Sequence, residues 1–226
     1  MPFNHVSRID DLVAIRHAIV SVFDKSGLPD LARGLVETCP GIRIYSTGGT
    51  LSALRTILDS AAEGVLVPME DYTGQPEMKG GLVKTLDWRI YLGLLSEPYD
   101  PDHEADRERT GAVAFDLVVG NLYPFGSVSK EPGPFETTRQ NIDIGGPCML
   151  RAAAKNFLRV AGVCDPGDYA AVLGELRDTG GRLGLATRSR LARKVFETTS
   201  RYDAAIASFL GARTADLATE YEVIDG

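Results

Sequence analysis

Residues 14–58, AIRHAIVSVFDKSGLPDLARGLVETCPGIRIYSTGGTLSALRTIL, decide the fold of this chain. An apolar run over 14–23 predicts a strand, and apolar residues at the spacing of an amphipathic helix follow over 28–35. The pattern then repeats, with a predicted strand over 42–45, a polar loop, and a helix that begins at Leu51. Such alternation is typical of a parallel sheet covered by helices. We therefore predict an α/β fold with a parallel central sheet flanked by helices.

The rest of the chain extends this pattern. Residues 112–119 predict a buried strand and residues 160–164 a short one, whereas 64–106 is less regular and 126–138 resembles a loop. The C-terminal third predicts helices, the last running from 187 to about 210 and split or bent near 199–200. We predict a single domain over residues 1–226 with a helical C-terminal extension.

The composition argues against several classes of protein. The net charge of -7 argues against general nucleic-acid binding, because counterion release needs a basic surface. Three cysteines without a CxxC pair indicate free thiols in a reducing compartment. The three histidines show no metal-ligand spacing, so we expect no metal site. No signal-peptide pattern or membrane-length apolar run is seen, so we expect a cytoplasmic protein without a membrane partner.

Two loops after predicted strands have the composition of a phosphate site. Thr47, Gly48, Gly49 and Thr50 combine hydroxyl groups with backbone amides at a helix start, where anions bind. Lys25 follows the preceding strand and would lie at the same edge of the sheet. Glycine and threonine are also common turn and cap residues. The pattern alone leaves both interpretations open.

The stretch NIDIGGPCMLRAAAKN over 141–156 joins a carboxylate to a helix start. Asp143 precedes a Gly-Gly-Pro turn, and we predict that Pro147 takes the first helical position. Unpaired amides and the positive end of the helix dipole would then lie near Asp143, and Lys155 follows on the same helix. This arrangement suits acid–base chemistry at a developing oxyanion, although an ordinary capped helix shows it too.

Lys84 and Tyr123 stand at similar positions, the first after a glycine pair and the second at a strand end. Loops at one sheet edge could bring them together with Asp143 and Lys155. A lysine near other cations, or a tyrosine beside a cation, has a lowered pKa suited to proton transfer near neutrality.

Six motifs occur in the order DKSG, STGGT, PEMKGG-VKTL, NLYPF, IDIGG and RAAAKN. Together they resemble the IMP cyclohydrolase domain of the bifunctional purine-biosynthesis proteins, from about residue 14 to residue 210. The resemblance implies a methylglyoxal-synthase-like fold and a homodimer. It also implies closure of a formylated imidazole-carboxamide ribotide to IMP, with loss of water and without cofactor or metal. We expect a stand-alone enzyme beside a separate transformylase partner.

The resemblance also implies a role for each site residue. Protons would be transferred by Lys84, Tyr123, Asp143 and Lys155. Substrate would be bound by Ser21, Lys25, Thr47, Gly48, Gly49, Thr50, Thr85, Asn121, Ile144, Gly145 and Gly146. Within that set, loop 47–50 and Lys25 would hold the phosphate, Thr85 and Asn121 would position the base, and the amides of 144–146 would hold the formyl oxygen. Asp143 and Lys155 would handle the carboxamide proton, and Lys84 and Tyr123 would protonate the departing oxygen.

The chain departs from the family pattern around the expected phosphate. Leu82 replaces an arginine, Asp87-Trp88 replaces His-Pro, Tyr91 replaces a histidine and Phe23 replaces a serine. A lost arginine–phosphate contact forfeits about 1.5–3 kcal/mol. Asp87 would repel an anion, unless Arg89 compensates for it. We interpret these changes as weaker or altered substrate binding with the chemistry retained.

Two other functions compete with this one. The chain could be a non-catalytic module that binds a ribotide or IMP, or a subunit that completes a split bifunctional enzyme. Turnover by the purified chain separates the first hypothesis from these alternatives.

Overall fold

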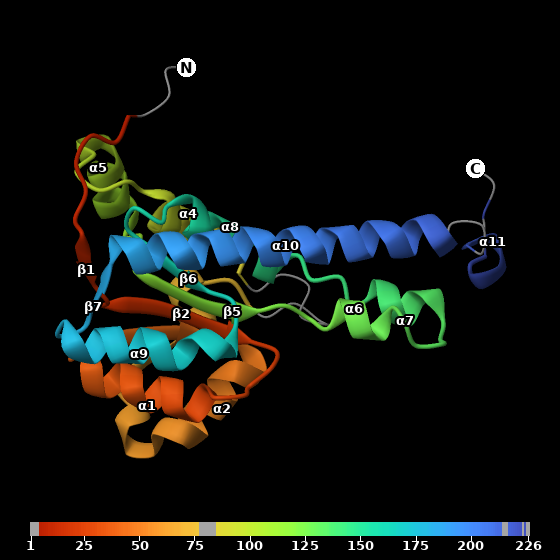
Figure 1. Ribbon diagram of the computed structural model, residues 1–226, viewed down its shortest axis with the longest axis horizontal. Helices are drawn as coiled ribbons and strands as arrows, with labels where there is room; N and C mark the ends of the chain where they lie inside the picture. The colour runs from red at the N-terminus through yellow and green to blue at the C-terminus, as the bar shows by residue number, and fades with distance from the viewer. Residues whose placement is uncertain (1–4, 77–84, 214–216, 223, 225–226) are drawn as a thin grey trace.

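A parallel sheet forms the centre of the protein (Figure 1). The structure is a computed structural model that describes residues 5–76, 85–213, 217–222 and 224. The sheet contains β2 (His17–Val22), β3 (Arg43–Ser46), β4 (Leu66–Pro68), β5 (Leu117–Asn121) and β6 (Ala161–Val163). Their order is β4-β3-β2-β5-β6, and every pair is parallel. The predicted fold class is confirmed.

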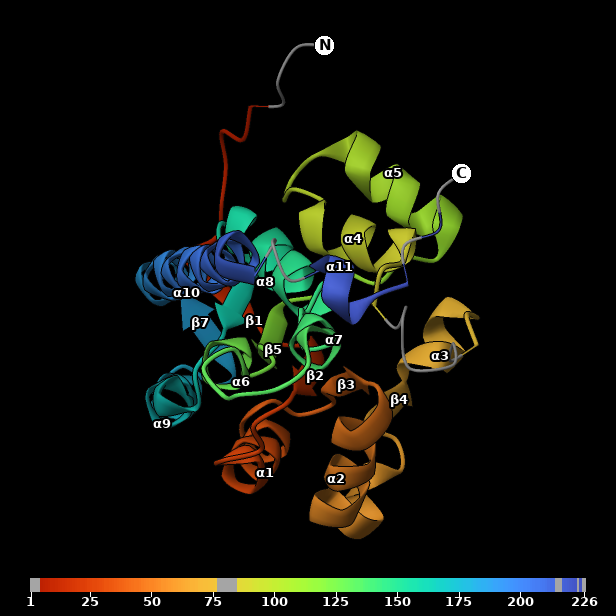
Figure 2. The same ribbon diagram turned by 90° about the vertical axis from the view of Figure 1, so that its right-hand side faces the viewer.

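Helices cover both faces of this sheet, as Figure 2 shows. One face packs against α1 (Leu28–Thr38), α2 (Gly48–Leu58) and α9 (Tyr169–Asp178). The other packs against α4 (Trp88–Leu95), α8 (Gly145–Lys155) and α10 (Leu185–Arg213). In β2, Ala18 and Val20 belong to the first apolar cluster and Ile19 to the second. A strand buried on both faces explains the continuous apolar run of its sequence.

The helical C-terminal extension is also confirmed. Helix α10 runs past the sheet and lies over α6 (Phe125–Val128) and α7 (Phe135–Arg139) (Figure 1). Phe125, Phe135, Tyr202 and Phe209 form a separate apolar cluster there.

Three expectations about local structure are wrong. Helix α10 is continuous through Thr199, so it is not split there, and the Thr199 hydroxyl donates to the Phe196 carbonyl at 3.3 Å within the helix. Residues 126–138 contain parts of two short helices rather than a loop. The strand expected over 14–23 begins at His17, because β1 (Leu12–Ala14) pairs with β7 (Arg182–Gly184) in a separate antiparallel ribbon.

The less regular middle is mostly helical where it is described. It holds β4, α3 (Met69–Thr73), α4 and α5 (Pro101–Thr110). The last described helix of the chain is α11 (Leu217–Glu220). Helix α5 buries none of its residues, so its sequence carries no apolar period to reveal it. In the part of the chain that the structure covers, no helix has both the length and the apolar content to cross a bilayer.

Candidate active site

A pocket of about 390 Å³ lies at the carboxyl ends of β2, β3 and β5. The chain leaves β2 toward β3 on one side and later returns to β5 on the other, so the pocket lies where the strand order reverses. Ligands of parallel α/β sheets bind at this kind of point. The predicted site residues in the pocket wall are Ser21, Lys25, Thr47, Gly48, Gly49, Thr50, Thr85, Asn121, Tyr123, Asp143, Ile144, Gly145 and Gly146.

The start of α2 forms one side of the pocket. The backbone turns there through Gly48, whose φ of 47° is in the left-handed region that favours glycine. The first amides of a helix have no partner within it, so Gly48 and Gly49 present donors to the pocket. The Thr50 hydroxyl instead accepts from the Val22 amide at 3.1 Å and donates to the Val22 carbonyl at 2.9 Å. It therefore ties α2 to the end of β2.

Asn121, the last residue of β5, holds the loop that carries Lys25. Its Oδ1 accepts from the amides of Phe23 at 2.7 Å and Asp24 at 2.9 Å, and its Nδ2 donates to the Asp24 carbonyl at 2.8 Å. The side chain that we expected to position the base thus shapes the phosphate-side loop. Lys25 itself is exposed.

Two aromatic rings meet at the mouth of the pocket. Phe23 and Tyr123 are 51% and 44% exposed, and their rings pack edge to face with 5.5 Å between centroids. From the sequence, Phe23 was noted only as a replacement for the serine of the family pattern. The structure shows that it also restrains Tyr123.

Asp143 lies in the pocket wall just before α8. Its Oδ1 accepts from the Gly146 amide at 2.9 Å. Burial raises the pKa of this carboxyl above its ordinary value, against the lowering effect of the Gly146 and Tyr123 amides. A carboxylate with a raised pKa beside an open pocket is suited to proton transfer.

The first two residues of α8 are glycines because neighbouring side chains lie too close to leave room for a Cβ atom. A Cβ on Gly146 would lie 2.4 Å from Asp143 Oδ2, and one on Gly145 would lie 2.9 Å from Thr85 Oγ1. The helix begins at Gly145, so Pro147 is its third residue, and the expectation that it is the first is wrong. A missing amide hydrogen is tolerated there too, because third-position amides also lack a helical partner.

The two predicted lysines of the catalytic set differ in placement. Lys84 lies outside the described residues, but its neighbour Thr85 is buried against the start of α8. Lys155 is exposed at the last position of α8, ten residues after Gly145 and so about 15 Å along the helix. It is not among the described residues of the pocket wall. The structure of one chain brings Asp143 and Tyr123 together and does not bring Lys155 to them.

Asp87 has a structural role that its sequence position did not indicate. Asp87 is 4% exposed and caps α4, with Oδ1 accepting from the Arg89 amide and Oδ2 from Gln75 Nε2, both at 2.8 Å. Trp88 begins α4 and is exposed, while Tyr91 is partly buried within that helix. Leu82 lies outside the described residues.

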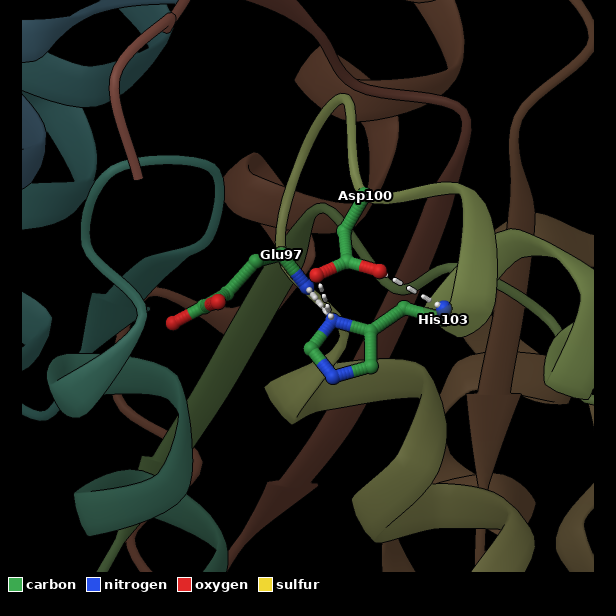
Figure 3. Close-up of side chains that lie close together, drawn as sticks. All are labelled: Glu97, Asp100 and His103. Carbon is green, nitrogen blue, oxygen red and sulfur yellow. Dashed lines mark hydrogen bonds and ion pairs between the residues drawn. The ribbon is translucent and has the colours of Figure 1, made fainter. Parts of the chain in front are cut away.

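The structure brings together three residues of types that bind metals, although their spacing in the sequence did not indicate a site. The prediction that His103 has no other metal-ligand type near it was therefore incomplete. Ligand atoms of Glu97, Asp100 and His103 lie within 4.8 Å of one another (Figure 3). Asp100 Oδ1 accepts the amides of Asp102 and His103, each at 3.0 Å, and His103 Nδ1 accepts the Glu97 amide at 3.1 Å. These bonds cap α5 and hold the turn before it, which accounts for the cluster without an ion.

Sequence reasoning missed some residues of the pocket. Gln140 and Ile142 line it from the segment just before Asp143, and Leu86 and Met149 complete the wall. Gln140 and Ile142 could have been found from their adjacency to Asp143 alone. The three cysteines are free, as expected, with Cys39 and Cys164 buried and Cys148 exposed.

Known proteins that resemble this chain agree with one another. A family described as AICARFT/IMPCHase bienzyme matches residues 153–224. Bifunctional purine biosynthesis protein PurH of Brucella canis is 44% identical over 217 residues, which make up 96% of this chain and 39% of that protein. PurH of Chlorobium luteolum is 48% identical over 197 residues, 87% of this chain and 36% of that protein. This chain therefore spans about two fifths of the length of these relatives.

A solved structure extends the likeness to the whole fold. The crystal structure of ForH aligns with a TM-score of 0.72 and 34% sequence identity. The alignment covers 87% of this chain and 100% of the ForH chain.

Proposed function

We propose that this chain, which belongs to the AICARFT/IMPCHase family, is an IMP cyclohydrolase of purine biosynthesis. It would close a formylated imidazole-carboxamide ribotide to IMP with release of water. One observation carries the proposal: the described residues that the family motifs assign to substrate all meet in a single pocket, together with Tyr123 and Asp143.

The ribotide phosphate would bind at the start of α2. The amides of Gly48 and Gly49 and the positive end of the helix dipole favour an anion there, and Lys25 supplies a cation from the neighbouring loop. Asn121 would act by fixing that loop, as its three hydrogen bonds indicate. Phe23 offers no hydroxyl to the phosphate, which makes this end of the site less polar than the family pattern.

Ring closure removes two protons from nitrogen and adds two to the formyl oxygen. The carboxamide nitrogen attacks the formyl carbon, a C–N bond forms, the nitrogen loses one proton to the Asp143 carboxylate, and the oxyanion takes one proton from solvent to become a hydroxyl group. This hydroxyl then leaves as water with a proton from Tyr123 or Lys84, while the C–O bond breaks, a C=N bond forms, and a ring nitrogen releases its N–H proton to solvent. Because the reaction is intramolecular, holding the two groups in contact supplies a large share of the acceleration.

The oxyanion formed on the formyl oxygen would lie at the start of α8. Gly146 already donates its amide to Asp143, so we assign the oxyanion contacts to the amides of Ile144 and Gly145. Preorganised amide donors of this kind are worth about 3–4 kcal/mol in acyl transfer.

Partners form the last part of the proposal. We propose a homodimer in which Lys155 acts from a second copy, since it is exposed and remote from the pocket of its own chain. The relatives carry the name of a bifunctional protein, so a transformylase would supply the formylated ribotide. Sedimentation of the purified chain, with and without K155A, tests the dimer separately from the chemistry.

A cyclisation assay tests the proposed activity. Purified chain, without added metal or cofactor, should convert the formylated ribotide to IMP, followed by the change in ultraviolet absorbance. Calorimetry with IMP separates the alternatives: binding without turnover would show a ribotide-binding module. Activity that appears only after a transformylase is added would show a subunit of a split enzyme.

A further inference from the structure

We infer that Tyr202, in the C-terminal half of α10, is a positioning residue for Asp143. The Tyr202 hydroxyl accepts the Asp143 amide at 2.7 Å and donates to the Asn141 carbonyl at 3.0 Å. One hydroxyl thus bonds both sides of the segment that carries the carboxylate. The catalytic meaning of this contact rests on the proposed function; the contact itself does not.

The hydroxyl is fixed by the packing of its own ring. Tyr202 is 9% exposed, and its ring packs against Phe125 with 6.0 Å between centroids. Phe125 is fully buried and packs in turn against Phe209 of the same helix as Tyr202, with 5.7 Å between centroids. A large, buried aromatic ring has little freedom to move, so its hydroxyl is a stable reference point.

The protonation state of Tyr202 suits a positioning role. Burial raises the pKa of Tyr202 to about 12. The hydroxyl therefore keeps its proton at neutral pH and can donate to Asn141 while it accepts from Asp143. Both bonds persist over the pH range in which Asp143 changes charge.

Asp143 is consequently restrained from two directions. Tyr202 holds its main-chain amide, and the Gly146 amide holds Oδ1 of its side chain at 2.9 Å. The space beside Gly146 admits no further atom, since a Cβ there would stand 2.4 Å from Oδ2. Small displacements of a reacting group cost a large part of its rate, so this double restraint matters for catalysis.

A matched contact elsewhere provides the control. The Tyr72 hydroxyl accepts the Val113 amide at 2.9 Å, within a packed aromatic group and away from Asp143. Tyr72→Phe therefore removes an amide-to-hydroxyl hydrogen bond of the kind that Tyr202→Phe removes, whereas Tyr202→Phe also removes the bond to the Asn141 carbonyl. Both variants should lower the thermal midpoint, and Tyr202→Phe should lower it more.

Kinetics of the full-length chain separate positioning from stability. With Y202F we expect kcat to fall about tenfold while KM changes less than about twofold, because the carboxylate loses its alignment but the phosphate contacts are intact. The acid limb of the kcat–pH profile should move to lower pH, as a loosened carboxylate gains water. Y72F should leave kcat and the profile unchanged. Equal kinetics in Y202F and wild type would overturn the inference.

Two measurements without substrate keep this test apart from that of the proposed function. In Y202F the Asp143 amide should exchange with solvent at least about tenfold faster, whereas in Y72F only the Val113 amide should. The carboxyl resonance of Asp143, followed by carbon NMR, should titrate at lower pH in Y202F than in wild type. Unchanged exchange and titration would contradict the inference even in an active enzyme. Inactive wild type with these shifts present would instead remove only the proposed function.

Discussion

Each end of the central sheet holds a carboxylate, one buried and one partly buried, and the two differ in their contacts. Asp116 stands just before β5, at the amino end of the strands, and Asp143 lies at the pocket beyond their carboxyl ends. Burial raises the pKa of both carboxyl groups. A raised pKa therefore does not by itself locate a site in this protein.

At the amino end of the sheet, the Asp116 carboxylate makes its contacts with other groups of the protein. Asp116 Oδ2 accepts the amides of Arg16 and His17 at 2.9 and 3.0 Å, and Oδ1 lies 3.7 Å from Arg159. Arg188, fully buried, donates to the carbonyls of five residues, which are Asp10, Asp11, Phe157, Leu158 and Leu183. These polar groups lock the segments before β2 and β6 in place.

At the carboxyl end Asp143 borders an open pocket instead. Its contacts orient the carboxylate but leave it next to the space where a ligand would lie. A buried charge whose hydrogen bonds are all made within the protein supports the fold, whereas the partly buried Asp143 beside a cavity is available for chemistry.

The largest effect expected is on turnover in Asp143→Asn. The amide keeps an oxygen for Gly146 but cannot take a proton, so kcat should fall about 10³-fold, within the range of general acid–base catalysis. Because the folded-state pKa of Asp143 is raised, its stability contribution is lost as pH rises through that pKa, and the ionised form costs stability at neutral pH. The melting temperature at pH 7 should therefore be no lower than that of wild type. If Asp143→Asn lost stability as well as activity, Asp143 would have a structural role like that of Asp116.

The next effect is on the fold, in Arg188→Ala. Five carbonyl groups, most of them partly buried, lose their donor, and the free energy of unfolding should fall by about 4 kcal/mol. Arg193→Ala on the same helix is the control, because its pair with Glu197 is exposed and worth about 0–1 kcal/mol. Urea unfolding monitored by circular dichroism measures both. If the free energy of unfolding fell by a similar amount in the two variants, the hydrogen bonds of Arg188 would add no more stability than an exposed ion pair.

Asp116→Asn should lower stability and leave kcat unchanged, whereas Asp143→Asn should lower kcat and leave stability unchanged. The amide group must place a donor either against Arg159 or against the Arg16 and His17 amides, which costs about 3 kcal/mol of stability. The kcat per folded molecule should stay within about twofold of wild type, since Asp116 is remote from the pocket. Paired unfolding and turnover measurements check this. A large fall in kcat at retained stability would abolish the distinction between the two ends.

The smallest effect concerns the pocket mouth, in Phe23→Ser. A hydroxyl at this position should gain about 1 kcal/mol of binding and lower KM for the ribotide about fivefold. Phe23→Ala removes the ring packed on Tyr123 without adding a hydroxyl, so any loss of kcat should be shared by both variants. Steady-state kinetics separate the two constants. Equal KM values in the two variants would show that the phosphate does not reach residue 23.

The sequence was sufficient for the part of the site that depends on strand ends. Polar loops after β2, β3 and β5 had to meet at one edge once the sheet was parallel, and the structure places Lys25, Thr47 and Tyr123 there. Helix α5 and the short helices α6 and α7 had no apolar period to reveal them.

Other features depended on distances and contacts across the chain. The separation of Lys155 from Asp143 could have been predicted, because a helix of that length carries its last residue away from its start. The contact from Tyr202 to Asp143 could not, since the two are separated by 59 residues and meet only through packing of α10.

The pH dependence of kcat for the wild-type chain with the formylated ribotide tests the central claim most directly. Asp143 must be ionised to accept a proton, so kcat should rise as pH rises through the pKa of Asp143. The midpoint should lie above the ordinary aspartate value of 3.8, and the residual activity of Asp143→Asn should lack this limb. A kcat that is independent of pH through the acid range, or no cyclisation by well-folded protein, would contradict the account.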